Sequence, residues 1–199
     1  MTKQLGFLEE PGTEEIKMPS VVKRLSAEVR TRVEHVKILV LDVDGVMTDG
    51  RLIYHDNGTE SKAFDVRDGH GIKMLREAGI ETALISGRSS PLVEKRAGDL
   101  GITEVIQGVR DKVEHLETIL STRNLTFDQA AFMGDDVVDL TVMNRVGFSV
   151  VVADGSEYLF DTAHYVTLSP GGRGAVREVA ELILGVQGLW DKIARRYFE

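Results

Sequence analysis

Residues 37–50 read Lys-Ile-Leu-Val-Leu-Asp-Val-Asp-Gly-Val-Met-Thr-Asp-Gly, and this stretch decides how the rest of the chain is interpreted. The mostly apolar run at 37–41 is typical of a buried strand, and it ends at two acids, Asp42 and Asp44, followed by Gly45. In open α/β sheets, ligands bind at the carboxyl ends of the strands, where the loops are open to solvent. Taken alone, however, an Asp-x-Asp-Gly sequence is explained equally well as a plain strand end followed by a turn.

Two carboxylates separated by one residue repel each other unless a positive group lies beside them. A hard divalent cation such as Mg²⁺ meets this need, because it prefers carboxylate oxygens and keeps water or a substrate phosphate as further ligands. One interpretation of Asp42 and Asp44 is therefore a cation site, and the other is a strand end followed by a turn. The rest of the sequence is needed to distinguish the two.

Composition limits the classes of protein. The 199 residues suit one domain, and a net charge of −8 argues against a general nucleic-acid or membrane surface. The absence of cysteine excludes disulfides, thiolate metal sites and cysteine nucleophiles. No apolar run has the length of a membrane span, and the first residues do not resemble a signal peptide. We therefore expect a cytoplasmic protein.

The segments near the first strand have distinct signals. Residues 1–19 predict a poorly ordered or loosely attached leader, and residues 20–199 a single domain. Ser20 is expected to cap a helix over 21–33. The pair Asn57-Gly58 predicts a hairpin over 51–64, because both residues tolerate positive φ. Such a hairpin would stand over the acidic loop as a flap, and a helix is expected to follow from about residue 72 to 78.

Further along, strands and helices alternate, which predicts an α/β fold with a doubly wound, Rossmann-like parallel sheet. Strands are expected at 81–85, 104–107, 130–133, 148–153 and 164–167, and helices at 91–100, 112–122, 137–146 and 157–160. The tail at 169–199 is expected to contain a glycine-rich loop, a helix and a last helix at 190–198. Each loop that follows a strand then lies at one edge of the sheet.

Four of these loops carry complementary chemistry. They present Asp42 and Asp44, then Ser86 with Arg88, then Lys112, and finally Asp135, Asp136 and Asp139. Asp135 can complete a metal site with Asp42, while Lys112 and Ser86 can hold phosphoryl oxygens. An aspartate near a metal and within reach of phosphorus is a plausible nucleophile, and Asp44 would then carry the proton.

These motifs resemble those of the haloacid dehalogenase superfamily, and most closely its capless branch, the 3-deoxy-D-manno-octulosonate 8-phosphate phosphatases of lipopolysaccharide synthesis. The narrower likeness runs over about 36–188 and rests on residues 64–69 (Phe-Asp-Val-Arg-Asp-Gly), 86–88, 94–96, 107–108, 134–139 and 171–178. The resemblance implies a β-hairpin flap in place of a cap domain. It also implies Mg²⁺-dependent hydrolysis through a phospho-aspartate.

The resemblance also implies roles for single residues. Asp42 would be the nucleophile, Asp44 the acid/base, and Ser86 and Lys112 the phosphoryl ligands. Mg²⁺ would bind Asp42, Asp135 and the backbone carbonyl of Asp44, and Asp139 would orient Lys112 or the metal's waters. The substrate site would be lined by Asp65, Val66, Arg67, Asp68, Gly69, Lys73, Arg88 and Arg96. Members of the family are tetramers in which the hairpins meet, and Arg173 would contact substrate in a neighbouring subunit.

Two positions bear on the substrate. Lys73 stands where many octulosonate phosphatases are expected to have arginine, and this removes a bidentate fork. Arg88 favours this branch over the 2-keto-3-deoxynonulosonate 9-phosphate phosphatases, where glutamate is expected. The alternatives are therefore a phosphatase for the nine-carbon acid or another sugar phosphate, and a catalytically silent homologue that serves as an oligomerisation module.

Overall fold

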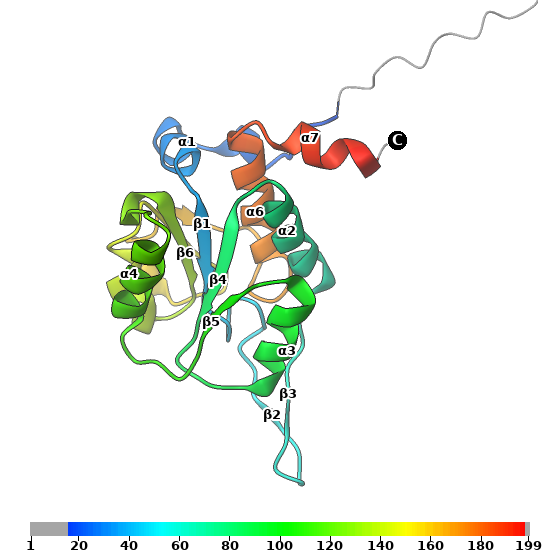
Figure 1. Ribbon diagram of the computed structural model, residues 1–199, viewed down its shortest axis with the longest axis vertical. Helices are drawn as coiled ribbons and strands as arrows, with labels where there is room; N and C mark the ends of the chain where they lie inside the picture. The colour runs from blue at the N-terminus through cyan, green and yellow to red at the C-terminus, as the bar shows by residue number, and fades with distance from the viewer. Residues whose placement is uncertain (1–15, 198–199) are drawn as a thin grey trace, which may run out of the picture.

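The structure is a computed structural model, and it describes residues 16–197. Its centre is a six-stranded sheet in the order β5-β4-β1-β6-β7-β8, and every pair in it is parallel (Figure 1). The strands are β1 (Ile38–Leu41), β4 (Glu81–Ile85), β5 (Glu104–Ile106), β6 (Ala130–Gly134), β7 (Phe148–Val151) and β8 (Tyr165–Val166). The predicted doubly wound α/β fold is confirmed.

Strand β1 lies in the middle of the sheet, and all four of its residues are buried. Its last residue, Leu41, is paired with Leu84 of β4 on one side and with Met133 of β6 on the other. Because these strands are parallel and in this register, their carboxyl ends meet at one edge of the sheet. The loops that follow β1, β4 and β6 therefore begin side by side.

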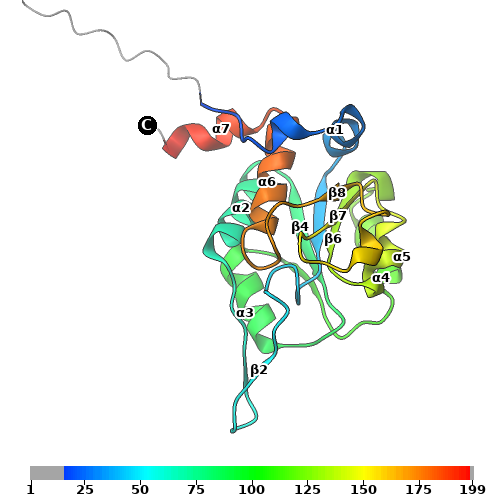
Figure 2. The ribbon, with the colours of Figure 1, turned by 180° about the vertical axis from the view of Figure 1, so that it is seen from behind.

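Helices cover both faces of the sheet, as Figures 1 and 2 show. Leu39 and Leu41 belong to the apolar cluster shared with α2, α3 and α6, whereas Ile38 and Val40 belong to the cluster shared with α4 and α5. This alternation follows from the period of two along a strand. The helices are α1 (Ala27–Glu34), α2 (Val66–Glu77), α3 (Pro91–Leu100), α4 (Lys112–Thr122), α5 (Leu140–Met143), α6 (Ala175–Val186) and α7 (Trp190–Ala194). Short 3-10 helices lie at Val22–Arg24, Phe127–Gln129, Val137–Asp139, Glu157–Leu159 and Arg195–Tyr197.

The predicted hairpin is present and projects from the carboxyl edge of the sheet (Figure 1). Strands β2 (Ile53–Tyr54) and β3 (Glu60–Ser61) pair antiparallel. Its loop has three residues, 56–58, because the His55 and Thr59 backbones still bond at 2.9 Å. Of the three loop residues, only Gly58 adopts positive φ, at 80°.

Two predicted helix starts were wrong. The first full helix begins at Ala27 and not at 21, because Leu25 is extended and Ser26 provides the cap by accepting from Val29 N at 3.2 Å. Helix α2 begins at Val66, about six residues earlier than expected, because Asp65 caps it through Arg67 N and Asp68 N.

The early start of α2 places Gly69 and Gly71 inside the helix, where they permit close packing. A Cβ on Gly71 would lie 3.1 Å from the Arg177 Cα of α6. A Cβ on Gly69 would lie 2.3 Å from the Arg96 guanidinium of α3. Gly71 thus permits the close approach of α6, Gly69 leaves room for the Arg96 side chain, and neither glycine ends the helix that carries it.

The helix expected over 137–146 is also shorter than predicted, since only a 3-10 turn and α5 form there. Helix α5 ends at Met143 because Gly147 packs against the turn at 127–129. There, Gly147 N donates to Phe127 O at 2.8 Å. Strand β7 and strand β8 are likewise shorter than their predicted ranges.

Both ends of the described chain pack together near α6 and α7 (Figure 2). Trp190 Nε1 donates to Lys17 O at 3.1 Å, and Val21 and Val22 are buried. Most of the predicted leader, residues 1–15, lies outside the described residues, but residues 16–19 belong to this packed region. None of the helices described over 16–197 is long and apolar enough to cross a bilayer.

Candidate active site

The centre of the site is a buried lysine between two carboxylates. Lys112, the first residue of α4, donates from Nζ to Asp42 Oδ1 at 2.5 Å and to Asp139 Oδ1 at 2.6 Å. The Lys112 side chain is 4 % exposed and that of Asp139 is 0 % exposed. A buried ammonium group is stable only when it is paired in this way. The arrangement therefore fixes Lys112 beside Asp42.

The carboxylates also decide the charge of this group. Burial acts to lower the pKa of Lys112, but Asp42 and Asp139 outweigh it and raise the pKa above its usual range. Burial raises the pKa of Asp42 to about 6, against the opposing effect of Lys112 and with a further contribution from Asp139. At neutral pH, Lys112 is therefore a cation and Asp42 is mostly ionised.

Asp139 holds more than Lys112. Its Oδ2 accepts from the backbone N–H of Asp135 at 3.0 Å, so it also fixes the loop after β6. A Cβ on Gly134 would lie 2.5 Å from the same oxygen, which explains the glycine at the end of this strand. Asp139 contacts Lys112, as one of its two expected roles requires, but it does not line the cavity described below.

Asp135 lies against the loop after β1. A Cβ on Gly45 would lie 2.0 Å from Asp135 Oδ2, so only glycine at 45, with φ of 97°, permits this approach. Burial raises the pKa of Asp135 to about 8, and the negative charges of Asp42, Asp139 and Asp136 add to the effect. Asp42 and Asp135 both have raised pKa values and both line one cavity. Two such carboxylates are a donor set that suits a hard divalent cation.

Among residues 16–197, no three His, Asp or Glu side chains are grouped closely enough to hold a metal ion. The Asp42 and Asp135 carboxylates, which both line the cavity described below, could hold such a cation together with the backbone carbonyl of Asp44. Such a mixed set, completed by water or substrate oxygens, is usual for Mg²⁺.

The Asp44 carboxylate is held by two cations from different elements. Lys62, from the second half of the hairpin, forms an ion pair with Asp44 Oδ1, and its side chain is 2 % exposed. Arg88 Nε lies 3.4 Å from Asp44 Oδ2. Lys62 was missed in the sequence, since no local signal showed that a lysine in an exposed hairpin points inward.

A cavity of about 450 Å³ opens between these loops. Four predicted catalytic residues line it, namely Asp42, Asp44, Ser86 and Lys112, and so do Arg88 and Asp135. Residues that the sequence did not single out for this role complete the lining: Gly87, Val109, Arg110, Asp136 and Val138. The volume suits a small phosphorylated molecule.

The other predicted substrate residues do not line this cavity. Asp68 is buried and accepts from Gly174 N at 3.2 Å and Arg177 N at 2.8 Å, so it ties α2 to the start of α6. Asp65 caps α2, and Gly69 lies against Arg96. Lys73 lies further along α2 and is half-buried. Within one chain, Asp65, Asp68 and Gly69 therefore have structural contacts with other parts of the same domain.

Arg96 and Arg173 also lie apart from the cavity. Arg96 donates to Asp65 O at 2.9 Å and lies over the Phe64 ring. Arg173 pairs with Asp49 of its own chain at 3.6 Å, and its side chain is 61 % exposed. Val66 and Arg67 are exposed at the start of α2.

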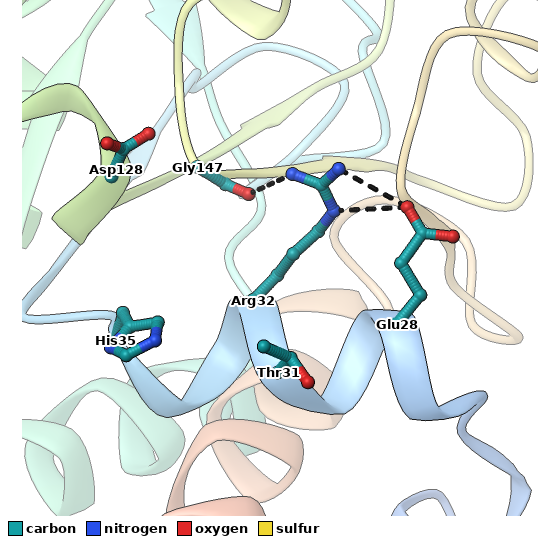
Figure 3. Close-up of a pocket in the computed structure, with 6 residues that line it drawn as sticks. All are labelled: Glu28, Thr31, Arg32, His35, Asp128 and Gly147. Atoms are coloured by element: carbon teal, nitrogen blue, oxygen red, sulfur yellow. Dashed lines mark hydrogen bonds and ion pairs between the residues drawn. The ribbon is translucent and has the colours of Figure 1, made fainter.

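A second hollow, of about 490 Å³, lies at the opposite edge of the sheet (Figure 3). It is lined by Asp128 and Gly147, which precede β6 and β7, and by side chains of α1. Arg32 spans it, donating to Gly147 O at 3.2 Å and to Glu28 Oε1 at 3.2 Å. It contains none of the predicted catalytic residues, so its slightly larger volume does not make it the active site.

The parallel sheet, the acidic loops and the paired lysine define the class as a haloacid dehalogenase-like hydrolase, and the sequence model of that class matches residues 97–178. The chain is 45% identical over 168 residues to 3-deoxy-D-manno-octulosonate 8-phosphate phosphatase of Escherichia coli strain B, with 84% of this chain and 89% of the relative covered. It is 48% identical over 160 residues to the Yersinia pestis phosphatase of the same name, with 80% and 86% covered.

Solved structures agree with these relatives. The crystal structure of the octulosonate phosphatase from Moraxella catarrhalis, in complex with magnesium ion, phosphate ion and KDO, superposes with a TM-score of 0.84 at 40% identity. The alignment covers 85% of this chain and 98% of that one. The chain belongs to the 3-deoxy-D-manno-octulosonate 8-phosphate phosphatase family.

Proposed function

We propose that this protein hydrolyses 3-deoxy-D-manno-octulosonate 8-phosphate to the free sugar acid and phosphate, a step in the synthesis of lipopolysaccharide precursors. The observation that carries the proposal is the Asp42–Lys112 pair inside a cavity that also contains Asp44, Ser86 and Asp135. The names of the relatives, and the KDO and phosphate in the Moraxella complex, support this substrate.

In the proposed mechanism, an Asp42 carboxylate oxygen attacks phosphorus, and the bond from phosphorus to the leaving sugar oxygen breaks. Asp44 donates a proton to that oxygen, so the sugar leaves as an alcohol. In the second half, Asp44 takes a proton from water as the water attacks the phospho-aspartate, and phosphate leaves with Asp42 restored. Lys112 and Ser86 hold the phosphoryl oxygens throughout.

Mg²⁺ is the cofactor of this reaction, as the Moraxella complex supports. The Asp42 and Asp135 carboxylates and the Asp44 carbonyl would hold it. When bound, it offsets the negative charge of the phosphoryl group. Lys112 supplies the remaining positive charge from the protein side, since it is already fixed beside Asp42.

The substrate contacts predicted on α2 and in the tail fit the proposal only if subunits meet. Arg88 lines the cavity of its own chain, whereas Val66, Arg67 and Arg173 are exposed away from it. We therefore propose a homotetramer in the cytoplasm, in which the hairpins meet and these residues reach a neighbouring site. Exposed apolar side chains on the hairpin support this assembly, since Leu52 is 43% exposed, Ile53 47% and Tyr54 67%.

A direct test is phosphate release from octulosonate 8-phosphate, compared with release from 2-keto-3-deoxynonulosonate 9-phosphate. We expect kcat/KM for the eight-carbon substrate to be at least about tenfold higher, since a few well-placed contacts suffice for such a ratio. Higher kcat/KM for the nine-carbon acid would reassign the substrate. No release from either acid would contradict the phosphatase assignment.

A further inference from the structure

Lys62 is the feature of the site that the proposed mechanism leaves unused. It lies next to β3, in a hairpin whose β2 residues are exposed, yet its own side chain is 2 % exposed. Its ammonium group forms an ion pair with Asp44 Oδ1, across 18 positions of sequence. A cation buried in this way costs free energy that a neutral side chain of similar size does not. Packing alone therefore does not explain a lysine here.

The hairpin reaches Asp44 by a second route. Arg88, in the loop after β4, lies 3.4 Å from Asp44 Oδ2 and 3.3 Å from Glu60 Oε2. Glu60 belongs to β3 and precedes Lys62 by two residues, so the hairpin contacts Asp44 directly through Lys62 and holds Arg88 through Glu60. Both oxygens of Asp44 are thus fixed by cations that the hairpin supplies or holds.

We propose that Lys62 is a positioning residue for proton transfer: it fixes the Asp44 carboxyl group at the cavity, and so makes the hairpin part of the catalytic apparatus. The proposal rests on the function of Asp44 proposed above. It differs from a role in assembly, because the contact lies within one chain. It also differs from substrate binding, because Lys62 does not line the cavity.

A distinctive consequence concerns the leaving group. A sugar alcohol leaves poorly and needs a proton from Asp44, whereas p-nitrophenolate is a stable anion and leaves without one. Loss of Lys62 should therefore slow the first chemical step with the sugar phosphate far more than with p-nitrophenyl phosphate. A general loss of structure would slow both.

The test compares Lys62→Met, Lys62→Arg and the control Lys95→Met, in which the same change is made at an exposed lysine of α3. Single-turnover reactions with enzyme in excess and saturating Mg²⁺ measure leaving-group release alone. We expect Lys62→Met to slow the sugar phosphate by about 10²-fold, the cost of a small misplacement of a catalytic group, and p-nitrophenyl phosphate by less than about fivefold. In parallel steady-state assays KM for the sugar phosphate should change little. In the single-turnover reactions Lys62→Arg should recover most of the rate, and Lys95→Met should match the wild type.

Asp44→Asn separates failure of this proposal from failure of the mechanism beneath it. If Asp44→Asn shows the leaving-group dependence and Lys62→Met does not, the positioning role is wrong and the acid role stands. If Asp44→Asn lacks the dependence, the acid role itself is wrong. The double variant should be no slower than Asp44→Asn alone, and additive losses would overturn the proposal.

Discussion

Asp42 is the residue on which the mechanism depends, and its surroundings explain why one aspartate among many can be a nucleophile. It follows a central strand in which all four residues are buried, so its position is fixed by the sheet. Lys112 holds one of its oxygens, and Asp139 holds Lys112 from the other side. Because burial raises the pKa of Asp42 only to about 6, the carboxylate is available at neutral pH.

Asp42→Asn should therefore abolish turnover and leave the fold intact. The amide keeps the size of the side chain and an oxygen that accepts from Lys112, but it does not attack phosphorus. We expect steady-state phosphate release to fall at least about 10³-fold, as is found when an enzyme's nucleophile is removed. Asp128→Asn, at the opposite edge of the sheet, is the control and should be fully active. Substantial activity in Asp42→Asn would refute the nucleophile assignment.

The protonation of Asp42 and Asp135 couples the stability of the chain to pH and to Mg²⁺. The pKa of Asp135 rises from an ordinary value of 3.8 to about 8, and that of Asp42 to about 6, in the metal-free chain. A raised pKa favours the folded state at low pH, so this stability is lost as pH rises from about 4 to about 8. Mg²⁺ should compensate, because it binds the ionised carboxylates.

We therefore expect Mg²⁺ to raise the thermal unfolding midpoint more at pH 8 than at pH 5. Thermal unfolding followed by circular dichroism, with and without Mg²⁺, measures this difference. Asp135→Asn removes one of the two carboxylates and should reduce the effect. An equal Mg²⁺ shift at both pH values would count against these ligands.

At the scale of elements, helices and strands with local signals were predicted closely. Helix α3 has Pro91 at its start and Gly101 in the left-handed conformation at its end, and both bounds agree with the prediction. The start of helix α2 did not agree with the prediction, because Gly69 and Gly71 look like helix breakers in the sequence. Their reason lies in the close approach of α3 and α6, which only the folded chain shows.

The residues of the site also divide into those with a local sequence signal and those placed only by packing in the folded chain. Asp42, Ser86 and Asp135 were predictable because each directly follows a strand of one sheet, and parallel strands bring their ends together. Lys62 was not, because its contact depends on how a hairpin folds back over the edge. Likewise, the use of Asp68 as a cap for a distant helix depends on the packing of α2 on α6.

The glycine-rich loop before α6 packs closely against the acidic loop that follows β1. Gly172 has φ of 62°, and a Cβ there would lie 2.4 Å from the backbone carbon of Thr48 in the acidic loop. We expect Gly172→Ala to lower the free energy of unfolding by about 1–3 kcal/mol and also to lower kcat, because the loop that carries Asp44 has to move. Gly98→Ala is a matched control in α3, where a Cβ meets nothing within 4 Å, and it should be neutral or stabilising. Chemical denaturation measures both, and equal stability of the two variants would contradict the account.

At the scale of the whole molecule, the hairpin projects away from the rest of the chain, and no other element of the chain packs over its tip (Figures 1 and 2). If hairpins meet in a tetramer, the double variant Ile53→Ser/Tyr54→Ser should form smaller species, since it removes the apolar contact area. Light scattering after size exclusion measures the mass directly. Tyr158→Ser, which removes an aromatic ring that is 71% exposed elsewhere, should leave the mass unchanged. A wild-type protein that is already monomeric would rule out the proposed assembly.

The whole molecule is a Mg²⁺-dependent sugar acid phosphatase whose site lies at the carboxyl edge of one parallel sheet. The measurement that tests this assignment most directly is inorganic phosphate release from 3-deoxy-D-manno-octulosonate 8-phosphate by the wild-type protein, with Mg²⁺ and then with EDTA in excess. We predict rapid release with Mg²⁺, loss of that release in EDTA, and its return when Mg²⁺ is restored. No phosphate release in the presence of Mg²⁺, or release that EDTA does not affect, would contradict the account.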